Sequence, residues 1–465
     1  MGYISGTVNK HYHFIGIGGI GMAGLAFLLM SKGYTVSGSD VKESPLLEKL
    51  RGQGARIFIG HQGDHARGAD FVIYSSAIAE DNAERVYAIH NKIPLLKRAQ
   101  LLSLIIGDDI SVTVAGAHGK TTTTSMVGQM LLKAGWDPTI AVGGIVNSGA
   151  YNASLGKGKY FVAEVDESDG SFLYFSPHFS IITNIDFEHI DYYHNWENIL
   201  AAYKKFIDKT HPQGCILGCG EDKRLAELLT ECKRSIMMYG ISNKNDIYAE
   251  NITLNGCGSS FDCMSAGKKI GTLTLSVPGQ HNILNALACA GVGLKLGIDF
   301  ETIASSLKEF TGVQRRFQIK AKTDDILVVD DYGHHPTEIK ATLNAARCLN
   351  PKRLVVAFQP HRYSRTKFLF EEFIESLSLS DYLIITDIYA ASEQAIPGVS
   401  AATLYEKIKK IKNENVIYLP KEEITRHLLG MMKTGDLILT LGAGDITKIS
   451  DEISRHVKDN HFQTT

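Results

Sequence analysis

Two glycine-rich turns in this chain have the residue types needed to hold phosphate groups. The first, Gly16-Ile17-Gly18-Gly19-Ile20-Gly21, has the spacing G-x-G-x-x-G, and the second, Gly116-Ala117-His118-Gly119-Lys120-Thr121, ends in Gly-Lys-Thr. Glycines allow backbone N–H groups to approach phosphate oxygens, and a helix that starts there adds the positive end of its dipole. The sequence therefore predicts two phosphate-containing ligands.

The first turn occurs with the other parts of a dinucleotide fingerprint. It follows the apolar run 11–15, opens an apolar helical stretch, and precedes Asp40 by 19 residues, counted from Gly21. An acid at this distance accepts hydrogen bonds from ribose hydroxyls. NAD and a UDP-sugar both contain a pyrophosphate and a ribose, and a turn of this kind can also serve only to pack a helix on a sheet. We expect a diphosphate ligand, held by Gly16, Gly18, Gly19, Gly21 and Asp40.

The second turn is the short form G-x-x-G-K-T of a phosphate loop, because Val114 stands where the longer pattern has glycine. Its amides would wrap the phosphates, Lys120 would place a positive charge on the β and γ oxygens, and the Thr121 hydroxyl could ligate Mg²⁺. A Gly-Lys pair can arise by chance, but its position between a predicted strand at 111–115 and a helix favours ATP. The predicted residues are Gly116, Ala117, His118, Gly119, Lys120, Thr121 and Thr122.

Two acidic clusters follow predicted strands in the same part of the chain. Strand 160–165 leads into Asp166-Glu167-Ser168-Asp169, and strand 181–185 leads into Asp186, Glu188, His189 and Asp191. Ligands bind at the carboxyl ends of parallel strands, and carboxylates beside a phosphate loop favour a divalent metal. Each acid alone could be a solvated loop residue or a helix cap. We expect Glu167 and His189 to be metal ligands.

Basic and aromatic residues gather at three further places. His281 and Asn285 lie four residues apart on a predicted helix, where they could contact an adenine or where the histidine could simply cap the helix. Arg315-Arg316, at a predicted domain junction, could reach phosphates. His361, Arg362 and Arg365 follow a strand and begin a predicted helix, where cations oppose the helix dipole, so we expect a bound anion rather than a solvated basic turn.

A repeated order of strand, turn and helix predicts parallel sheets of the α/β class. The 465 residues exceed one ordinary core, and we expect three domains: 1–107 and 315–465 Rossmann-like, and 108–314 a P-loop ATPase-type parallel sheet with a small antiparallel insertion within 246–277.

Composition excludes several classes of protein. The net charge of -2 argues against a general nucleic-acid binder, and no apolar run reaches the roughly 20 residues of a membrane span. The 7 cysteines are scattered without paired spacing, which disfavours a disulfide framework. We expect a cytoplasmic monomer or homodimer whose partners are small molecules.

In its motifs and their order the sequence resembles the Mur ligase family over essentially its whole length. The resemblance rests on these segments: His13 to Met22, Gly116 to Thr124, Glu164 to Asp169, Thr183 to Ile185, His281-Asn282, Asp331 to Pro336 and Phe358 to Thr366. The family usually has threonine where Ala117 stands, which leaves the backbone cradle intact but removes a hydroxyl.

This resemblance implies an ADP-forming amide ligase of peptidoglycan precursor synthesis. Its substrates would be ATP with Mg²⁺, UDP-N-acetylmuramate and L-alanine. Site roles carried over from the family would be these: UDP substrate at Gly16 to Gly21, Asp40, Ser75 and Ser76; ATP at the phosphate loop, His281 and Asn285; metal at Thr121, Glu167 and His189; amino acid at Tyr332, His361, Arg362 and Arg365; catalysis by Lys120, Glu167, His189 and His334. Arg316 is expected at the ATP site from its own position at the domain junction.

Two alternatives stay open at this point. One is a related ligase that joins a recycled peptide to the same UDP substrate. The other is a nicotinamide-dependent oxidoreductase or binding protein that uses Gly16 to Gly21 and Asp40. The lysine loop disfavours the oxidoreductase, because hydride transfer needs no residue for a γ-phosphate.

Overall fold

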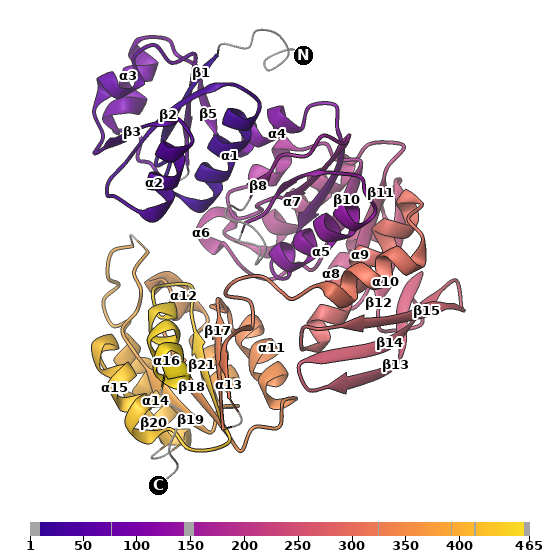
Figure 1. Ribbon diagram of the computed structural model, residues 1–465, viewed down its shortest axis with the longest axis vertical. Helices are drawn as coiled ribbons and strands as arrows, with labels where there is room; N and C mark the ends of the chain where they lie inside the picture. The colour runs from indigo at the N-terminus through magenta and orange to yellow at the C-terminus, as the bar shows by residue number, and fades with distance from the viewer. Residues whose placement is uncertain are drawn as a thin grey trace. The chain divides into compact units, whose positions relative to one another are not determined.

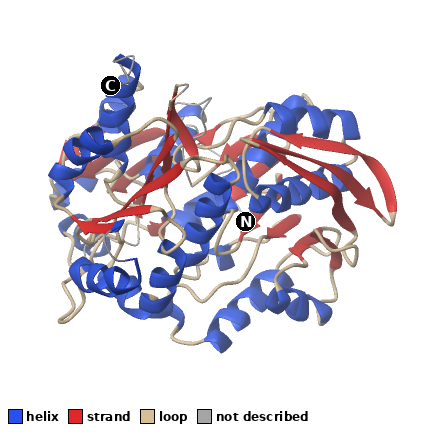
Figure 2. Cartoon of the chain, turned by 90° about the horizontal axis from the view of Figure 1, so that it is seen from below, coloured by secondary structure: helices blue, strands red, loops and turns tan. Residues whose placement is uncertain are grey.

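The computed structural model describes residues 10–75, 77–143, 153–323, 325–391, 393–412 and 415–459. Within these ranges the strands form three sheets, and helices pack against them (Figure 1), which confirms the predicted α/β class. Figure 2 shows helices beside many of the strands. The chain divides into two compact units: Met1–Glu250 with Cys263–Gly271 and Leu284–Leu307, and Asn251–Asp262 with Thr272–Ile283 and Lys308–Thr465.

The first sheet is parallel throughout and has the order β3-β2-β1-β4-β5. Chain order reverses between β1 and β4, and ligands of such sheets bind outside the strand ends at this point. The first glycine turn follows β1, and Ser75 follows β4. The elements are β1 His11–Ile15, α1 Ile20–Ser31, β2 Thr35–Asp40, α2 Pro45–Gly52, β3 Arg56–Ile59, η1 Gly63–Ala66, β4 Phe71–Tyr74, α3 Ala83–His90, β5 Leu95–Lys97 and α4 Arg98–Ile106.

The second sheet has ten strands in the order β15-β14-β13-β12-β11-β10-β6-β9-β7-β8. Strand β6 lies between β10 and β9 and runs parallel to both, so the segments that follow these three strands meet at one edge of the sheet. They are the phosphate loop, Thr183 onward, and the acidic turn after Glu164. The strands are β6 Ile110–Ala115, β7 Thr139–Ala141, β8 Ala153–Ser154, β9 Tyr160–Glu164, β10 Phe179–Ile182, β11 Cys215–Cys219 and β12 Ser235–Gly240.

The predicted antiparallel insertion is present, and it extends this sheet. Strands β13 (Ile247–Asn255), β14 (Gly258–Ser265) and β15 (Lys268–Leu275) are joined by turns at Gly256 and Gly267, which are too short for a parallel crossover. Both glycines have positive φ, as such turns require. The helices of the same chain segment are α5 Lys120–Lys133, η2 Ser171–Tyr174, α6 Ile190–Tyr193, α7 Trp196–Asp208, α8 Lys223–Thr230, α9 Gln280–Leu296 and α10 Phe300–Glu309.

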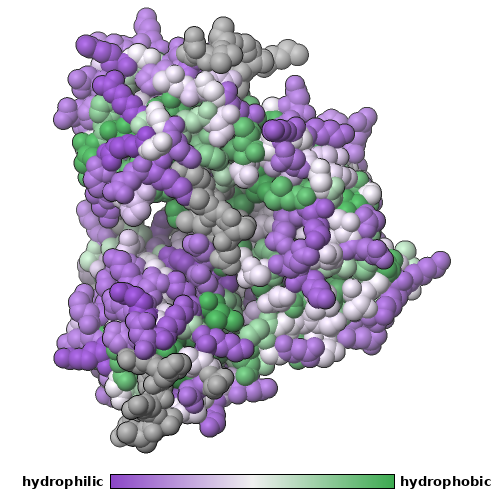
Figure 3. All heavy atoms as spheres, viewed as in Figure 1, coloured by the Kyte–Doolittle hydropathy of each residue, from purple (hydrophilic) through white to green (hydrophobic). Residues whose placement is uncertain are grey.

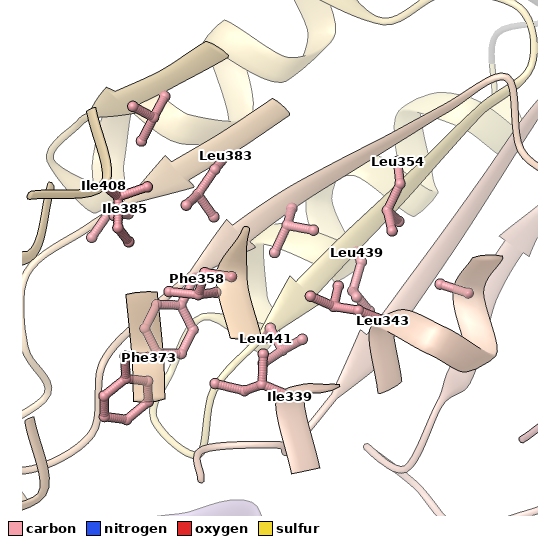
Figure 4. Close-up of a cluster of buried hydrophobic side chains, with 14 of the residues drawn as sticks. Ile339, Leu343, Leu354, Phe358, Phe373, Leu383, Ile385, Ile408, Leu439 and Leu441 are labelled. Atoms are coloured by element: carbon pink, nitrogen blue, oxygen red, sulfur yellow. The ribbon is translucent and has the colours of Figure 1, made fainter. Parts of the chain in front are cut away.

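The third sheet has the order β16-β17-β21-β18-β19-β20, with β16 antiparallel and the rest parallel. Apolar side chains cover its faces, and Figure 4 shows one such cluster with Phe358 and Phe373 among its residues. The strands are β16 Gln318–Lys322, β17 Ile326–Asp331, β18 Arg353–Phe358, β19 Tyr382–Ile385, β20 Val416–Tyr418 and β21 Asp436–Leu441. The helices are α11 Pro336–Arg347, α12 Tyr363–Phe368, α13 Phe370–Leu377, α14 Ala401–Lys412, α15 Lys421–Met431 and α16 Thr447–Asp459.

Two local predictions differ from the structure. Strand β10 ends at Ile182 rather than at residue 185. The Thr183 amide still donates to the Ala115 carbonyl of β6 at 3.0 Å, and the side chains of Thr183 and Asn184 bond the phosphate loop. Helix α12 has only 6 residues, and Arg362 before it has a φ of 70°, so the expected opposition between cations and a helix dipole is small there.

Hydrophilic side chains cover much of the face seen in Figure 3. Within the described ranges no helix combines the length and the apolar character that crossing a membrane requires.

Candidate active site

The phosphate loop joins β6 to α5 and takes a shape that only glycine allows at two positions. Gly116 has a φ of 128° and Gly119 a φ of 85°, both in the left-handed region. A Cβ atom on Gly119 would lie 2.8 Å from Oδ1 of Asn285. The loop therefore depends on both glycines, as the sequence pattern indicated.

Two side chains from the end of β10 fix the loop. The Asn184 Oδ1 accepts from the His118 amide at 2.9 Å, and its Nδ2 donates to the His118 carbonyl at 3.0 Å. The Thr183 hydroxyl donates to the same carbonyl at 2.6 Å. The imidazole of His118 in turn contacts Asp186 Oδ2 at 2.9 Å. Thr183, Asn184 and Asp186 were not among the predicted site residues, although the order Thr-Asn-Ile at a strand end was the signal for the first two.

Lys120 contacts the acidic turn that follows β9. Its ammonium lies 2.7 Å from Glu167 Oε1 and also donates to the carbonyls of Gly116 and Ala117. Burial lowers the pKa of Lys120, but the negative charges of Glu167 and Asp166 outweigh burial and raise the pKa above its ordinary value. The lysine is therefore charged and held at the loop where phosphates would bind.

Glu167 is the centre of a possible metal site. It is buried, its Oε1 lies 3.4 Å from His189 Nε2, and Glu188 lies 3.6 Å from the same nitrogen. Oε2 of Glu167 has no hydrogen-bond partner. These three residues offer ligand atoms within 4.8 Å of one another. The carboxylates fit Mg²⁺, which prefers oxygen ligands, better than the imidazole does.

The structure thus brings together Glu167 and His189, the two residues expected to be metal ligands. It places Glu188 beside them, which the sequence indicated only as one member of an acidic cluster. Thr121 lies buried in the first turn of α5, where its carbonyl accepts from Ser125. Asp166 lies beside Glu167, and its carboxyl has a lowered pKa. Desolvation alone would raise this pKa, but the charge of Lys120, hydrogen bonds from Ser168 and the charge of the more distant Arg98 together have a larger, opposite effect.

The first glycine turn is closed by hydrogen bonds inside the protein. The amides of Gly16 and Ile17 donate to the Ser39 carbonyl, and the Gly18 amide donates to Asp40 Oδ2 at 2.8 Å. A diphosphate at this turn would therefore meet the first amides of α1, which have no partner four residues back, rather than those of Gly16 and Gly18. Asp40 also accepts from Val41.

The remaining predicted residues of this site have different outcomes. Ser75 follows β4, and its hydroxyl is 3.9 Å from where a Cβ on Gly16 would stand. Ser76 lies outside the described residues. Gly21 faces Arg98, whose Cδ would be 3.3 Å from a Cβ at that position. Arg98, the first residue of α4, was not predicted.

In the second unit, aromatic and cationic groups surround the segment after β17. The guanidinium groups of Arg315 and Arg316 lie 4.8 and 5.1 Å from the centre of the Tyr332 ring. The ring of His334 is 5.4 Å from Tyr332 and 5.7 Å from His361. Tyr332, His334 and His361 therefore form one cluster with Arg315 and Arg316, and all five residues were predicted to bind ligands or to act in catalysis.

The basic segment after β18 completes this cluster. Arg365 Nη1 lies 3.2 Å from His361 Nδ1, and the ring of Tyr389 stacks on His361 at 5.6 Å. Burial, followed by the charges of His334 and nearby arginines, lowers the pKa of His361 to about 3, so this imidazole is neutral at physiological pH. Arg362 instead lies 3.9 Å from Glu393. Tyr389 and Glu393 were missed because they lie in an irregular loop without a motif.

The predicted adenine residues have separate local surroundings. Asn285 accepts a hydrogen bond from Thr123 of α5 at 3.1 Å, which places it beside the phosphate loop. His281 belongs to the second unit, where burial and then the charge of Arg316 lower its pKa to about 4. Arg316 pairs with Glu338 at 3.2 Å.

The fold and the site define a three-sheet α/β protein with a lysine-bearing phosphate loop beside a carboxylate cluster. The chain belongs to the Mur ligase family. Three models of that family match it: "Mur ligase family, catalytic domain" over residues 11–109, "Mur ligase middle domain" over 114–293, and "Mur ligase, glutamate ligase domain" over 315–444.

Relatives and solved structures agree with this assignment. UDP-N-acetylmuramate–L-alanine ligases of Trichlorobacter lovleyi and Geotalea uraniireducens are both 46% identical to this chain. The alignments cover 97% of this chain and 100% and 99%, respectively, of the two relatives. The crystal structure of UDP-N-acetylmuramate–alanine ligase from Thermotoga maritima has a TM-score of 0.83 at 30% identity, covering 97% of this chain and 99% of that one. A murein peptide ligase from Psychrobacter arcticus has a TM-score of 0.72 at 25% identity over the same shares.

Proposed function

We propose that this protein joins L-alanine to the carboxylate of UDP-N-acetylmuramate, using ATP and releasing ADP and phosphate, as a step of peptidoglycan precursor synthesis in the cytoplasm. The observation that carries the proposal is the contact of Lys120 with Glu167, beside His189, at the edge of the sheet where the phosphate loop begins. The 46% identity to ligases of this name supports the choice of substrates.

Phosphoryl transfer would come first. A carboxylate oxygen of the UDP substrate attacks the γ-phosphorus of ATP, the bond to the β–γ bridging oxygen breaks, and ADP leaves with that electron pair. Lys120 would move its charge from Glu167 to the phosphate oxygens, and Thr183 and Asn184 would keep the loop in place. The product is an acyl phosphate.

Mg²⁺, when bound, would neutralise charge on the β- and γ-phosphates. Glu167 and Glu188 offer carboxylate oxygens, and His189 offers a nitrogen. Thr121 would add its hydroxyl. The unpartnered Oε2 of Glu167 supports this use, because a buried carboxylate oxygen otherwise lacks a compensating contact.

Amide formation would follow. The neutral amine of L-alanine attacks the acyl carbon, the bond from this carbon to the phosphate oxygen breaks, and the amine loses a proton. We assign the binding of the alanine carboxylate to Arg365 with Arg362. Tyr332 and neutral His361 would contact the methyl side chain of L-alanine. His334 would accept the proton, since Glu338 lies 3.2 Å from its Nδ1 and would stabilise the imidazolium.

The domain assignment follows the same proposal. Residues 1–107 would bind the UDP substrate at the start of α1, with Asp40 and Ser75. Residues 108–314 would bind ATP, with His281 among the contacts, and residues 315–465 would bind the amino acid, with Arg316 as a further contact to ATP. A monomer or homodimer is proposed as the assembly.

One assay tests the function. Phosphate release is measured with ATP, Mg²⁺ and UDP-N-acetylmuramate, with L-alanine, another amino acid or a muramyl peptide as acceptor. Release that depends on L-alanine is expected. Release that depends on the peptide would instead identify the recycling ligase, and binding of NAD(H) without phosphate release would point to an oxidoreductase.

A further inference from the structure

Arg98 lies between the two predicted phosphate sites of the first unit. Its side chain crosses the first turn of α1, where a Cβ on Gly21 would come within 3.3 Å of both its Cδ and its Nη1. Its other terminal nitrogen, Nη2, lies 3.9 Å from Asp166 Oδ2, and Asp166 precedes Glu167. One guanidinium group therefore faces the start of α1 and the acidic turn beside Lys120.

The ion pair with Asp166 does not account for this placement. The two side chains are 31% and 42% exposed, and a pair of such groups at this distance contributes little to stability. The other oxygen of Asp166 accepts from the Ser168 amide at 2.9 Å. The guanidinium is thus held loosely by its acid and keeps donors for another anion.

The backbone beneath Arg98 is fixed more firmly. In α4, the Ser103 hydroxyl donates to the carbonyl of Tyr174, the last residue of η2, at 2.9 Å. The same short helix is bonded to the acidic turn, because the Phe172 amide donates to the Asp166 carbonyl at 2.8 Å. The backbone of Arg98 and the acidic turn are therefore held at a defined spacing. A residue that positions a group of the substrate needs such a fixed backbone.

We propose that Arg98 binds the carboxylate of UDP-N-acetylmuramate and holds it for attack on the γ-phosphate. This inference rests on the proposed function. The diphosphate has the first amides of α1 available to it, whereas the carboxylate must lie farther along, toward Lys120, and Arg98 is a cation on that route. Gly21 is then needed to let the arginine cross the helix as well as to pack it.

Binding of three probes to the full chain tests the proposal: UDP, UDP-N-acetylglucosamine, which lacks the carboxylate, and UDP-N-acetylmuramate. Calorimetric titration compares the wild type with Arg98→Gln and Arg98→Lys. Arg51→Gln is the matched control, because Arg51 lies in the same sheet domain and pairs with exposed Glu43. Arg98→Gln is expected to weaken UDP-N-acetylmuramate about 10-fold and to change the other two probes less than about 2-fold, with Arg98→Lys between.

Three results would overturn the inference. Equal loss of affinity for all three probes would assign Arg98 to the diphosphate. Unchanged affinities with a lowered Tm would make Arg98 a purely structural residue. A KM for ATP that rises while the KM for UDP-N-acetylmuramate stays constant would assign it to the nucleotide. Failure of the proposed function has a different signature, because wild-type protein would then bind UDP-N-acetylmuramate no more tightly than UDP-N-acetylglucosamine.

Discussion

The ammonium group of Lys120 lies 2.7 Å from Oε1 of Glu167, an oxygen that also faces the imidazole of His189 at 3.4 Å. The residue expected to hold phosphates is thus paired with a residue expected to hold the metal. Phosphates and a divalent cation would replace this pair together, the phosphates taking Lys120 and the cation taking Glu167. Binding of the two ligands should therefore be coupled.

Lys120→Ala is expected to lower kcat by at least about 100-fold, because a charge aimed at the transferring phosphoryl group is lost. Affinity for UDP-N-acetylmuramate should stay unchanged, since that ligand is assigned to the start of α1. Lys133→Ala, at the other end of α5, is the matched control. Near wild-type turnover of Lys120→Ala at saturating ATP would contradict the role of Lys120.

Glu167→Gln is expected to shift the Mg²⁺ activation curve to about 10-fold higher concentration at almost constant side-chain volume. The variant leaves Lys120 without its closest anion, so a modest loss of stability should accompany the shift. Glu197→Gln, at an exposed position of α7, controls for net charge. An unchanged activation curve would move the metal to Glu188 or Asp166.

Gly18→Ala tests the first glycine turn. The added Cβ would stand 2.8 Å from Asp40 Oδ2, so the aspartate must move and give up its bond with the Gly18 amide. We expect affinity for UDP-N-acetylmuramate to fall about 10-fold, with the KM for ATP unchanged. Gly52→Ala is the control, because a Cβ there meets nothing within 4 Å. Loss of ATP affinity alone would reverse the assignment of the two phosphate sites.

Arg365→Ala should raise the KM for L-alanine about 10- to 150-fold, the equivalent of losing a charge-assisted hydrogen bond of roughly 1.5 to 3 kcal/mol. Arg362→Ala should have a smaller effect, because Arg362 is shared with Glu393 at 3.9 Å. Arg426→Ala, at an exposed position of α15, is the control. If the KM for ATP rises instead, these arginines serve the phosphates, and the amino acid lies nearer Tyr332.

A buried acid-histidine network should make the first domain sensitive to acid. Glu84 accepts from Ser39 at 2.7 Å and contacts His13 at 2.9 Å, and both Glu84 and His13 are fully buried. Burial lowers the pKa of His13. Burial alone would raise the pKa of Glu84, but the hydrogen bonds from His13 and Ser39 have a larger, opposite effect, so the pKa of Glu84 is lowered overall.

Both shifts have the same sign for stability. The unfolded chain binds protons at these groups more readily than the folded chain, so the stability they contribute is present at neutral pH and is lost as pH falls, first through the ordinary histidine value near 6.5 and then near 4.3. We expect the Tm to fall between pH 7 and pH 5. His13→Asn should have a lower Tm at pH 7 and a weaker dependence on pH. An equal dependence in both proteins would contradict this account.

The sequence by itself determined the elements and the chemistry of the turns. The glycines at 116 and 119 are required by local backbone angles, and strand, turn and helix follow from residue patterns over a few positions. The α/β class and the pairing of Glu167 with His189 could be predicted because parallel strands bring their carboxyl ends to one edge.

Only the tertiary structure decided which side chains from distant segments touch. Asn184 bonds the phosphate loop, Arg98 crosses Gly21, and Tyr389 stacks on His361. The partners in these contacts are separated in the sequence by more than 60, more than 70 and almost 30 positions, respectively, so the contacts depend on strand order and on the paths of loops. Such contacts leave no periodic signal, because the free energy that selects them comes from packing of whole elements rather than from neighbours in the chain.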